Sequence, residues 1–320
     1  MDTKPSITYI KNGKEKTIKI NIANKNIVLN RLFDKKVHMH RFFRFVLIYE
    51  YKFKKDIDKI IFKNFTFKED KLLLFNQNNN LNQIIHLENC TFNSRVQIEF
   101  KNVEIINHQT NEDNIKIDNC DYAYIDVSKT DKDTSLIVEE CKNLELISGD
   151  NLKRLTISSK NASIKNLSPI NNSILFIDNN LTLQDSIYEA TMITTKRLNL
   201  INSRISNEQN LTLNCKIINL VDSVIKSKDS LYINNLSKIE FNDIIDDTIL
   251  DTSSYIEAEN KIYIENNIYL SNKKEKIVLS KEELEEFIQQ YENKESEELK
   301  QNYSIKENST SKFKKLVFKK

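Results

Sequence analysis

The densest group of chemically capable side chains in this sequence lies between Lys35 and Lys55. His38 and His40 are two residues apart, which places both rings on one face if the segment is a β-strand. Two histidines so placed could serve as a general acid and base in RNA cleavage, or as two metal ligands. Basic and aromatic residues surround them, and that mixture is typical of surfaces that contact phosphates and stack on bases.

We therefore predict a nucleic-acid interface in this segment. Its predicted members are Lys35, Lys36, His38, His40, Arg41, Phe42, Arg44, Lys52, Lys54 and Lys55. Two alternatives stay open: an ordinary surface that contacts a protein partner, and a catalytic role for the histidine pair. The basic residues support an electrostatic role, but nothing in the segment completes an active site, so no catalytic residue is predicted.

The four cysteines each follow a polar turn residue. Asparagine precedes Cys90, Cys120 and Cys215, and Glu140 precedes Cys141. This pattern predicts one structural position repeated in different coils, with the thiols buried and reduced. A metal site or a disulfide is the alternative. Because no pair has the short spacing of a zinc motif and no histidine accompanies the cysteines, neither a metal nor a cofactor is predicted.

Carboxylates are plentiful but scattered. Asp126, Glu139, Asp178, Asp222 and Asp243 fall mostly at predicted turns, where acidic residues are common. The sequence also lacks a glycine-rich phosphate loop, a nucleophile elbow and a histidine-rich metal motif. The chain is therefore not predicted to be an enzyme, although a polysaccharide-active enzyme stays an alternative.

A repeat that is clearest between Leu155 and Leu250 must position these groups. Each turn contains two pairs of alternating apolar residues with a polar step between the pairs. The first pairs begin 18 to 20 residues apart, at Leu155, Leu175, Ile193, Leu211 and Leu231. The alternation predicts β-strands with one inward face, and the period predicts that these strands stack as coils of a parallel β-helix.

The polar step is most often asparagine, which tolerates left-handed backbone angles and suits a bend that glycine would otherwise occupy. This choice explains how a chain with only 2 Gly and 2 Pro can turn so often. Aligning the turns predicts a ladder of Asn64, Asn89, Asn102, Asn119, Asn179, Asn214 and Asn234, with Glu140, Ser159 and Thr195 as departures. In these features the chain resembles the right-handed parallel β-helix superfamily from Lys59 to Asn272. The resemblance implies a right-handed coil.

Two segments before the repeat are predicted to be β-structure. Ile7 to Ile22 alternate on either side of Asn12 and Gly13, a strong turn pair that predicts a hairpin. Phe43 to Phe53 also alternate, which predicts a strand with an aromatic face.

The period changes after the repeat. Ser280 and Glu283 form a capping-box pattern ahead of apolar residues at helical spacing, which predicts a capping helix from Ser280 to about Asn293. We therefore predict an all-β solenoid, a right-handed parallel β-helix of about eight to ten coils, in three parts. Residues 1–58 form a basic head, residues 59–272 form the β-helix, and residues 273–320 form the capping helix and a basic tail.

Charge is segregated along the chain. Lysine and arginine outnumber aspartate and glutamate by 16 to 6 in residues 1–63, a net charge of +10. Residues 64–272 carry 20 against 30 (net −10), and residues 273–320 carry 12 against 10 (net +2). The basic end of the chain would attract polyanions.

These features favour a non-enzymatic binding protein. Its basic head would dock on nucleic acid or a nucleoprotein complex, and a solenoid face would engage a protein partner, for example as an inhibitor. The alternatives are an acidic solenoid that mimics nucleic acid, a polysaccharide-active enzyme and a filament-forming protein. No export signal is visible and the longest apolar run, Phe45 to Tyr49, is far too short for a bilayer, so we expect a cytoplasmic protein without membrane contact.

Overall fold

The computed structural model describes residues 4–21, 23–42, 44–54, 57–68, 71–75, 83–92, 95–110, 115–130, 133–168, 173–236, 238–241, 254–259, 261–264, 267–271, 277–279, 305–307 and 313–316. They belong to two compact units, Met1–Leu175 and Phe176–Lys320. Both are built from strands that pair with strands one coil away, and the chain forms a β-solenoid of about eight turns. The predicted all-β solenoid is confirmed. Its right-handedness stays a prediction from the resemblance.

Unit 1 contains a hairpin, a helix, a long two-stranded ribbon and the first coils. Its elements are β1 (Ser6–Lys11), β2 (Lys14–Lys19), α1 (Lys25–Leu32), β3 (Phe33–Phe42), β4 (Arg44–Phe53), β5 (Lys59–Lys63), β6 (Thr66–Phe67), β7 (Lys71–Phe75), β8 (Ile84–Glu88), β9 (Thr91–Phe92), β10 (Arg95–Glu99), β11 (Asn102–Ile106), β12 (Gln109–Thr110), β13 (Ile115–Asp118), β14 (Tyr122–Asp126), β15 (Thr134–Ile147) and β16 (Leu152–Lys165).

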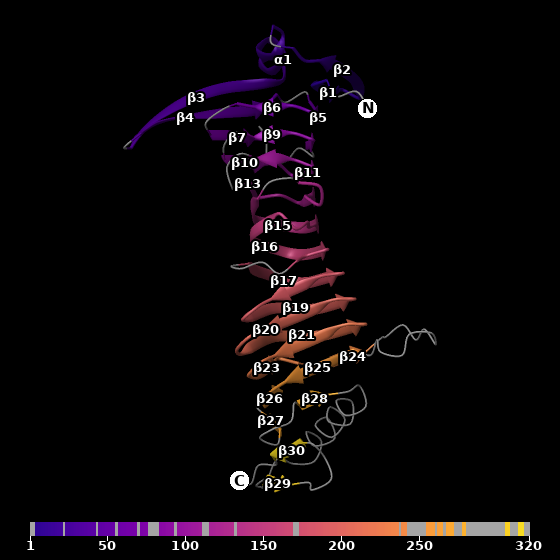
Figure 1. The fold of residues 1–320 in the computed structure, drawn as a ribbon. Helices are drawn as coiled ribbons and strands as arrows, with labels where there is room; N and C mark the ends of the chain where they lie inside the picture. The colour runs from indigo at the N-terminus through magenta and orange to yellow at the C-terminus, as the bar shows by residue number, and fades with distance from the viewer. Residues whose placement is uncertain are drawn as a thin grey trace. The chain divides into compact units, whose positions relative to one another are not determined.

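Three columns of parallel strands build the coils of unit 1 (Figure 1). Column 1 contains β4, β7, β10, β13 and the first halves of β15 and β16. Column 2 contains β5, β8, β11, β14 and the second halves of β15 and β16. Column 3 contains the short strands β6, β9 and β12. Each coil must therefore bring the chain back to the same three places, which is why the sequence repeats.

The N-terminal hairpin joins the first coil. β1 pairs antiparallel with β2 around Asn12 and Gly13, whose φ angles of 50° and 70° are those of a left-handed turn. β1 also pairs antiparallel with β5, so the hairpin extends column 2 beyond its first parallel strand. The predicted hairpin is confirmed from Ser6 to Lys19, and Ile22 lies outside the described residues. The predicted division of the chain at residues 58 and 272 stays a prediction.

Unit 2 uses the same three-column plan. Its elements are β17 (Ile174–Gln184), which begins before the unit boundary, β18 (Ile187–Glu189), β19 (Met192–Ile201), β20 (Arg204–Asn207), β21 (Leu211–Val221), β22 (Val224–Ser227), β23 (Ser230–Asn234), β24 (Lys238–Phe241), β25 (Tyr255–Ala258), β26 (Lys261–Ile264), β27 (Asn267–Ser271), β28 (Ile277–Leu279), β29 (Ile305–Glu307) and β30 (Phe313–Leu316). Parallel stacking continues to β25 and β26, which then pair antiparallel with β28 and β27. The predicted capping helix from Ser280 to Asn293 lies outside the described residues.

In the strands of the coils, alternate residues point into the core. In unit 1, Ile85, Val103 and Ala123 lie in register on β8, β11 and β14 and are fully buried. In unit 2, Leu198 and Ile218 lie in register on β19 and β21 and are also fully buried. Burying one large aliphatic side chain contributes about 1.5–3 kcal/mol, so the repeated columns are the main source of stability.

Left-handed residues turn the chain at two different corners of the coil, with φ between 46° and 60°. Those that follow a column 2 strand are Asn64, Asn89, Asn107, Asn166, Asp185, Asn202 and Asp222. Those that follow a column 1 strand are Asn119, Glu140 and Asn235. Asparagine and aspartate are enriched at such angles because their short polar side chains can hydrogen-bond locally.

The predicted single ladder of asparagines is therefore wrong in its alignment. Asn64 and Asn89 belong to one corner and Asn119 to the other. Asn214, within β21, and Asn234, at the end of β23, have no left-handed angles. The last two do form a ladder of side chains. The amide of Asn234 donates to the Oδ1 of Asn214 (2.9 Å), and the amide of Asn214 donates to the hydroxyl of Thr194 (3.1 Å).

A second ladder of buried serines lies at the corner after column 2 in unit 2. The backbone N–H of Ser186 donates to the hydroxyl of Ser203 (3.1 Å), that of Ser203 to the hydroxyl of Ser223 (3.0 Å), and that of Ser223 to the hydroxyl of Ser254 (2.9 Å). These bonds satisfy donors that the tight corner would otherwise bury without partners.

The left-handed corners lead to a stability prediction at Asn89, whose φ is 50°. Replacing Asn89 by alanine should lower the free energy of unfolding by about 1 kcal/mol, because alanine is strained at this angle, whereas glycine should be tolerated. Urea unfolding measures both variants. Asn102 begins a strand without a left-handed angle, and Asn102→Ala is the matched control. Equal losses for Asn89→Ala and Asn89→Gly would contradict the assigned corner.

Candidate nucleic-acid interface

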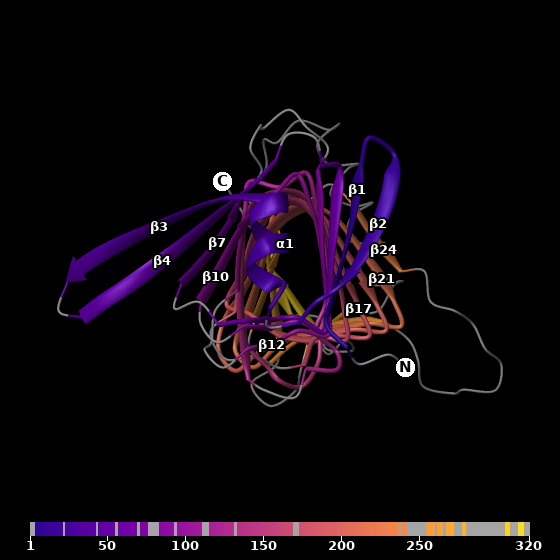
Figure 2. The ribbon, with the colours of Figure 1, turned by 90° about the horizontal axis from the view of Figure 1, so that it is seen from above.

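Strands β3 and β4 form a ribbon that leaves the coils of unit 1. They pair antiparallel over their whole length, from Phe33 opposite Phe53 to Phe42 opposite Arg44. β4 also pairs with β7, but from Ile48 to Lys52, and among the described strands the rest of the ribbon pairs with itself. Figure 2 shows the two strands running outward side by side. The predicted strand from Phe43 to Phe53 is confirmed as β4, and Phe43 lies outside the described residues.

Aromatic packing fixes the base of this ribbon. Phe33 contacts Tyr51 and Phe53 edge to face, with ring centroids 5.6 and 5.4 Å apart, and Phe53 contacts Phe100 at 4.7 Å. Helix α1 runs directly into β3, and its buried residues are Val28, Leu29 and Leu32. The base of the ribbon is therefore packed into the apolar core of unit 1.

The predicted interface residues are distributed along the ribbon. Lys35 and Lys36 are exposed on β3, and Lys35 Nζ lies 5.0 Å from the ring centroid of Tyr49 and 5.4 Å from that of Tyr51. Lys52 lies 3.5 Å from Glu50 on β4, and Lys54 donates to the backbone carbonyl of Asn30 at 2.9 Å. Lys54 therefore contacts the backbone of α1, whereas Lys35 and Lys36 on β3 face solvent.

The outer part of the ribbon carries the remaining residues. His38 is paired with Ile48, His40 with Val46, Arg41 with Phe45 and Phe42 with Arg44. The two histidines occupy alternate positions of a strand, as the sequence predicted. Lys55 lies outside the described residues. Residues 37–47 contain two arginines and two histidines and no acidic residue, whereas the rest of the ribbon carries three lysines together with Asp34 and Glu50.

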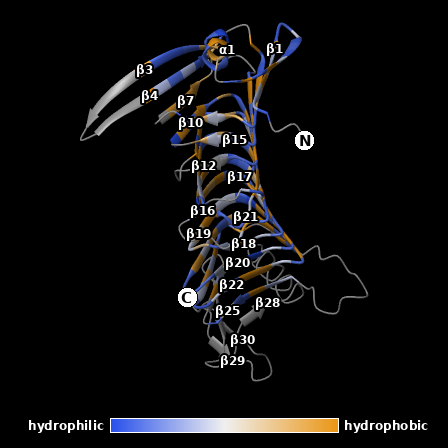
Figure 3. Cartoon of the chain, turned by 45° about the horizontal axis from the view of Figure 1, so that its top comes forward, coloured by the Kyte–Doolittle hydropathy of each residue, from blue (hydrophilic) through white to orange (hydrophobic). Residues whose placement is uncertain are grey.

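The basic residues of the neighbouring elements lie outside the predicted interface. Lys11, Lys14, Lys16 and Lys19 are exposed on the β1–β2 hairpin, and Arg31 is exposed in the last turn of α1. Figure 3 shows hydrophilic residues along the hairpin and the described part of β3. The lysines on both sides of Asn12 and Gly13 are visible in the sequence, but a predicted hairpin does not by itself indicate a ligand.

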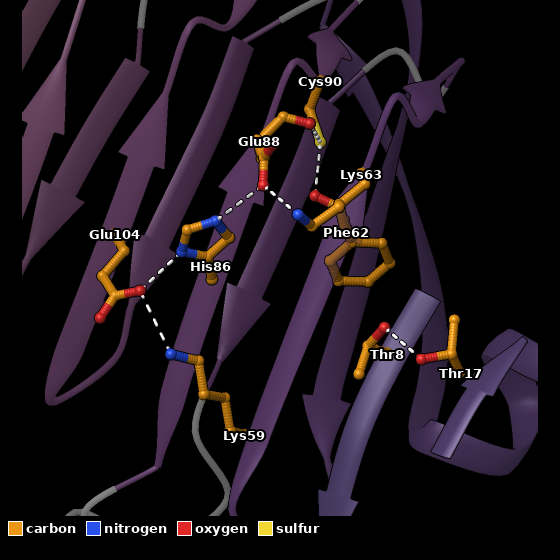
Figure 4. A network of polar contacts seen from close by, with 9 residues as sticks. All are labelled: Thr8, Thr17, Lys59, Phe62, Lys63, His86, Glu88, Cys90 and Glu104. Carbon is orange, nitrogen blue, oxygen red and sulfur yellow. Dashed lines mark hydrogen bonds and ion pairs between the residues drawn. The ribbon is translucent and has the colours of Figure 1, made fainter. Parts of the chain in front are cut away.

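A second polar group lies on the outer face of column 2 in unit 1. The Nδ1 of His86 lies 2.6 Å from a carboxylate oxygen of Glu104, and its Nε2 lies 3.5 Å from Glu88 (Figure 4). Lys59 approaches Glu104 at 3.3 Å and Lys63 approaches Glu88 at 2.6 Å. Three successive strands, β5, β8 and β11, bring these residues together.

This group is a balanced ionic network. Each carboxylate has a lysine as well as the His86 ring as a partner, so the charges are matched within the network. Partial burial would raise the pKa of Glu104, but the hydrogen bond with His86 and the charge of Lys59 outweigh it and hold this pKa below its usual value. The arrangement ties three coils together and leaves no obvious place for a reacting group.

The predicted position of the cysteines is partly wrong. All four are buried, as predicted. Cys120, Cys141 and Cys215 follow column 1 strands or lie at that corner, but Cys90 lies at the other corner, after β8. The cause is the same as for the asparagines, since a polar residue precedes the cysteine at both corners.

The described members of the scattered carboxylates lie on different strands and corners. Asp126 accepts hydrogen bonds from the N–H and hydroxyl of Ser128 (3.0 and 2.6 Å), and Glu139 pairs with Lys116 at 2.6 Å. Asp178 is exposed, Asp222 occupies a left-handed corner, and Asp243 lies outside the described residues. Within the described ranges no group of three or more His, Cys, Asp or Glu side chains could hold a metal.

His108 is a titratable group that the sequence analysis did not single out. It follows β11, is fully buried, and neither ring nitrogen has a hydrogen-bond partner in the described part of the chain. Its ring centroid lies 6.5 Å from that of Phe92. Burial without a partner lowers the pKa of His108 to about 4, because the charged ring would lose its hydration.

Comparisons of the chain with protein-family models, curated proteins and solved structures found no match. Within the described residues, no helix has both the length and the apolar character that crossing a membrane requires. The assignment of function therefore depends on the geometry and charge of the sites themselves.

The ionic network predicts a pH-dependent contribution to stability. Glu104→Gln should lower the free energy of unfolding by about 1 kcal/mol at neutral pH, because the half-buried network loses a charge. The carboxylate stabilises the fold above its unfolded pKa, and this contribution is lost as the pH falls through the lower folded pKa. Urea unfolding should therefore show the two proteins converging in acid. Exposed Glu189→Gln is the control, and a pH-independent gap would contradict the network's role.

His108 predicts a second, separate pH effect. The pKa of His108 is lower in the folded protein than its value of 6.5 in the unfolded chain. The free energy of unfolding is therefore highest above pH 6.5 and decreases as the pH falls toward about 4. The loss should approach about 3 kcal/mol, from the shift between those two values. The His108→Leu variant should lack this part of the acid slope in urea unfolding between pH 7 and 4.5. An unchanged slope would show that the ring is not buried in its neutral form.

Proposed function

We propose that this chain is a non-enzymatic binding protein that docks on nucleic acid through the β3–β4 ribbon. The observation that carries the proposal is a projecting two-stranded ribbon whose outer part, residues 37–47, contains basic residues and no acidic ones. A two-stranded ribbon is narrow enough to enter a major groove, and it can also follow a phosphate backbone. The exposed Lys35 and Lys36 extend the same charge toward the base of the ribbon.

The distribution of charge along unit 1 also favours binding of a polyanion near the ribbon. Residues 1–63 carry a net +10, whereas residues 64–175 carry 12 basic against 16 acidic residues, a net −4. A polyanion would be attracted to the first elements of unit 1 and repelled by its coils. Arginine is suited to phosphate because its planar guanidinium can donate two parallel hydrogen bonds. In this proposal Arg41 and Arg44 bind phosphate groups of the nucleic acid.

The coils supply the second part of the proposal, a rigid face for a protein partner. In unit 2, Phe176 and Met192 lie on neighbouring strands β17 and β19 and are 55% and 53% exposed. Contiguous exposed apolar patches mark protein contacts, and these two side chains lie on paired strands. A partner bound there could be a component of a nucleoprotein complex, which the chain would then inhibit or recruit. The proposal places the chain in the cytoplasm, where free thiols are ordinarily kept reduced.

The other interpretations have less support. Many acidic side chains of the coils are paired with lysines, as in the Lys116 contacts with Asp118 and Glu139, which weakens the idea of a nucleic-acid mimic. A polysaccharide enzyme would need carboxylates grouped around an open cleft, and the His86 network has its charges matched internally. The exposed lysines of β2 oppose end-to-end filament growth through that strand.

The interface predicts salt-dependent binding that variants of the ribbon weaken. Fluorescence anisotropy with labelled duplex DNA and single-stranded RNA would measure affinity across a series of salt concentrations. The Lys35→Ala/Lys36→Ala and Arg41→Ala/Arg44→Ala double variants should each weaken binding about tenfold or more at low salt. Each should also reduce the slope of log affinity against log salt by roughly 2, because two phosphate contacts are lost.

The charge-matched control is Lys153→Ala/Arg154→Ala, which removes two exposed basic residues from β16. It should bind as the unaltered chain does. Absence of binding at low salt, or equal losses for the control and the ribbon variants, would overturn the proposed interface.

A further inference from the structure

Two cysteines of unit 1 lie directly above one another in consecutive coils. Cys120 follows β13, and Cys141 lies at the same corner of β15, where Asp118 is paired with Glu139 two residues earlier. Each cysteine comes directly after a left-handed residue with φ of 51°, Asn119 in one coil and Glu140 in the other. The backbone therefore presents both thiols in the same direction, and their Sγ atoms are 2.9 Å apart.

This arrangement meets the backbone requirement for a disulfide. In-register parallel strands hold equivalent residues about 4.8 Å apart, and disulfides join Cα atoms that are about 4.4–6.8 Å apart. The two cysteines are already in contact, so the S–S bond needs side-chain rotation and a small approach of two neighbouring strands. No rearrangement of the coil is required.

The other two cysteines provide an internal comparison. Cys90 donates a weak hydrogen bond to the carbonyl of Phe62 at 3.5 Å, and Cys215 is in register with Thr195. Both are fully buried, and among the described residues neither is hydrogen-bonded to another thiol. Burial raises the pKa of each thiol to about 12, which suppresses the reactive thiolate.

We propose that Cys120 and Cys141 are an oxidative modification site, at which a hydroperoxide converts the two thiols into a reversible disulfide between consecutive coils. Cys141 attacks the peroxide, forms a sulfenic acid and releases an alcohol or water. Cys120 then attacks that sulfur, forms the S–S bond and releases water. Two thiols and one hydroperoxide thus give one disulfide, one alcohol or water molecule and one water molecule, and the two electrons reduce the O–O bond.

The surroundings of the pair favour this order of attack. Cys120 donates its S–H to Cys141, and this hydrogen bond lowers the pKa of Cys141 while it raises that of Cys120. Asn119, Glu140 and Lys142 next to the thiols in sequence are exposed, so both sulfurs lie just beneath the surface of the corner. A small hydroperoxide can therefore reach them through local opening of this corner.

The disulfide would close a loop between residues 21 apart and lock the coil that contains β14. It removes entropy from the unfolded chain, so the oxidised protein should be more stable. In a reducing cytoplasm such bonds are usually transient and report on oxidants. The site therefore gives the protein a stability that depends on redox conditions, independently of what the ribbon binds.

The test uses the full chain treated with hydrogen peroxide and then with iodoacetamide. Peptide mapping without reductant should find the Cys120–Cys141 crosslink, with the loss of two hydrogens from the intact mass, and dithiothreitol should reverse both. The oxidised chain should also show a urea midpoint higher by roughly 0.5–1 M. The Cys215→Ser control should behave like the unaltered chain, whereas Cys120→Ser and Cys141→Ser should show no crosslink and no rise.

Two results would overturn the proposal. One is an unaltered chain in which peroxide oxidises cysteines without joining Cys120 to Cys141. The other is a crosslink that appears in urea-unfolded chain as readily as in folded chain and joins Cys90 or Cys215 equally often. Both results are read on the unaltered chain, so they do not depend on whether the serine variants fold.

Discussion

Backbone hydrogen bonding between strands one coil apart is the constraint on which this structure depends. It places each residue above its counterpart in the next coil, as Ile85, Val103 and Ala123 show in unit 1. Most inward positions are therefore apolar or, like the stacked serines of unit 2, hydrogen-bonded to one another, and the buried His108 is an exception. Outward positions carry no such demand, and the outer part of the β3–β4 ribbon leaves the stack altogether.

The strands of the coils could be predicted from sequence because the inward residues alternate within each column. Leu211 and Leu213 do so in the first half of β21, and Ile218 and Leu220 do so in its second half. The corners could not. Asparagine supplies left-handed angles after column 1 and after column 2, so aligning asparagines merged two corners into one ladder. The placement of Cys90 failed for the same reason.

The interface could be predicted only in part. The alternating segment after Phe43 predicts β4. In contrast, β3 has adjacent lysines at positions 35 and 36 and little alternation of its own. Its strand conformation depends on the pairing with β4, which no local pattern shows. The contact between His86 and Glu104 joins residues 18 apart and exists because two coils stack. No local pattern marks such a pair, nor the burial of His108, because both depend on which coil position a residue occupies.

Nuclear Overhauser contacts between strands, measured in deuterated, selectively labelled protein, test the stacking of the coils most directly. In-register parallel stacking predicts contacts between the backbones of β8 and β11 around Ile85 and Val103, and of β11 and β14 around Val103 and Ala123. Antiparallel contacts between strands adjacent in sequence, with none between these coil partners, would contradict it.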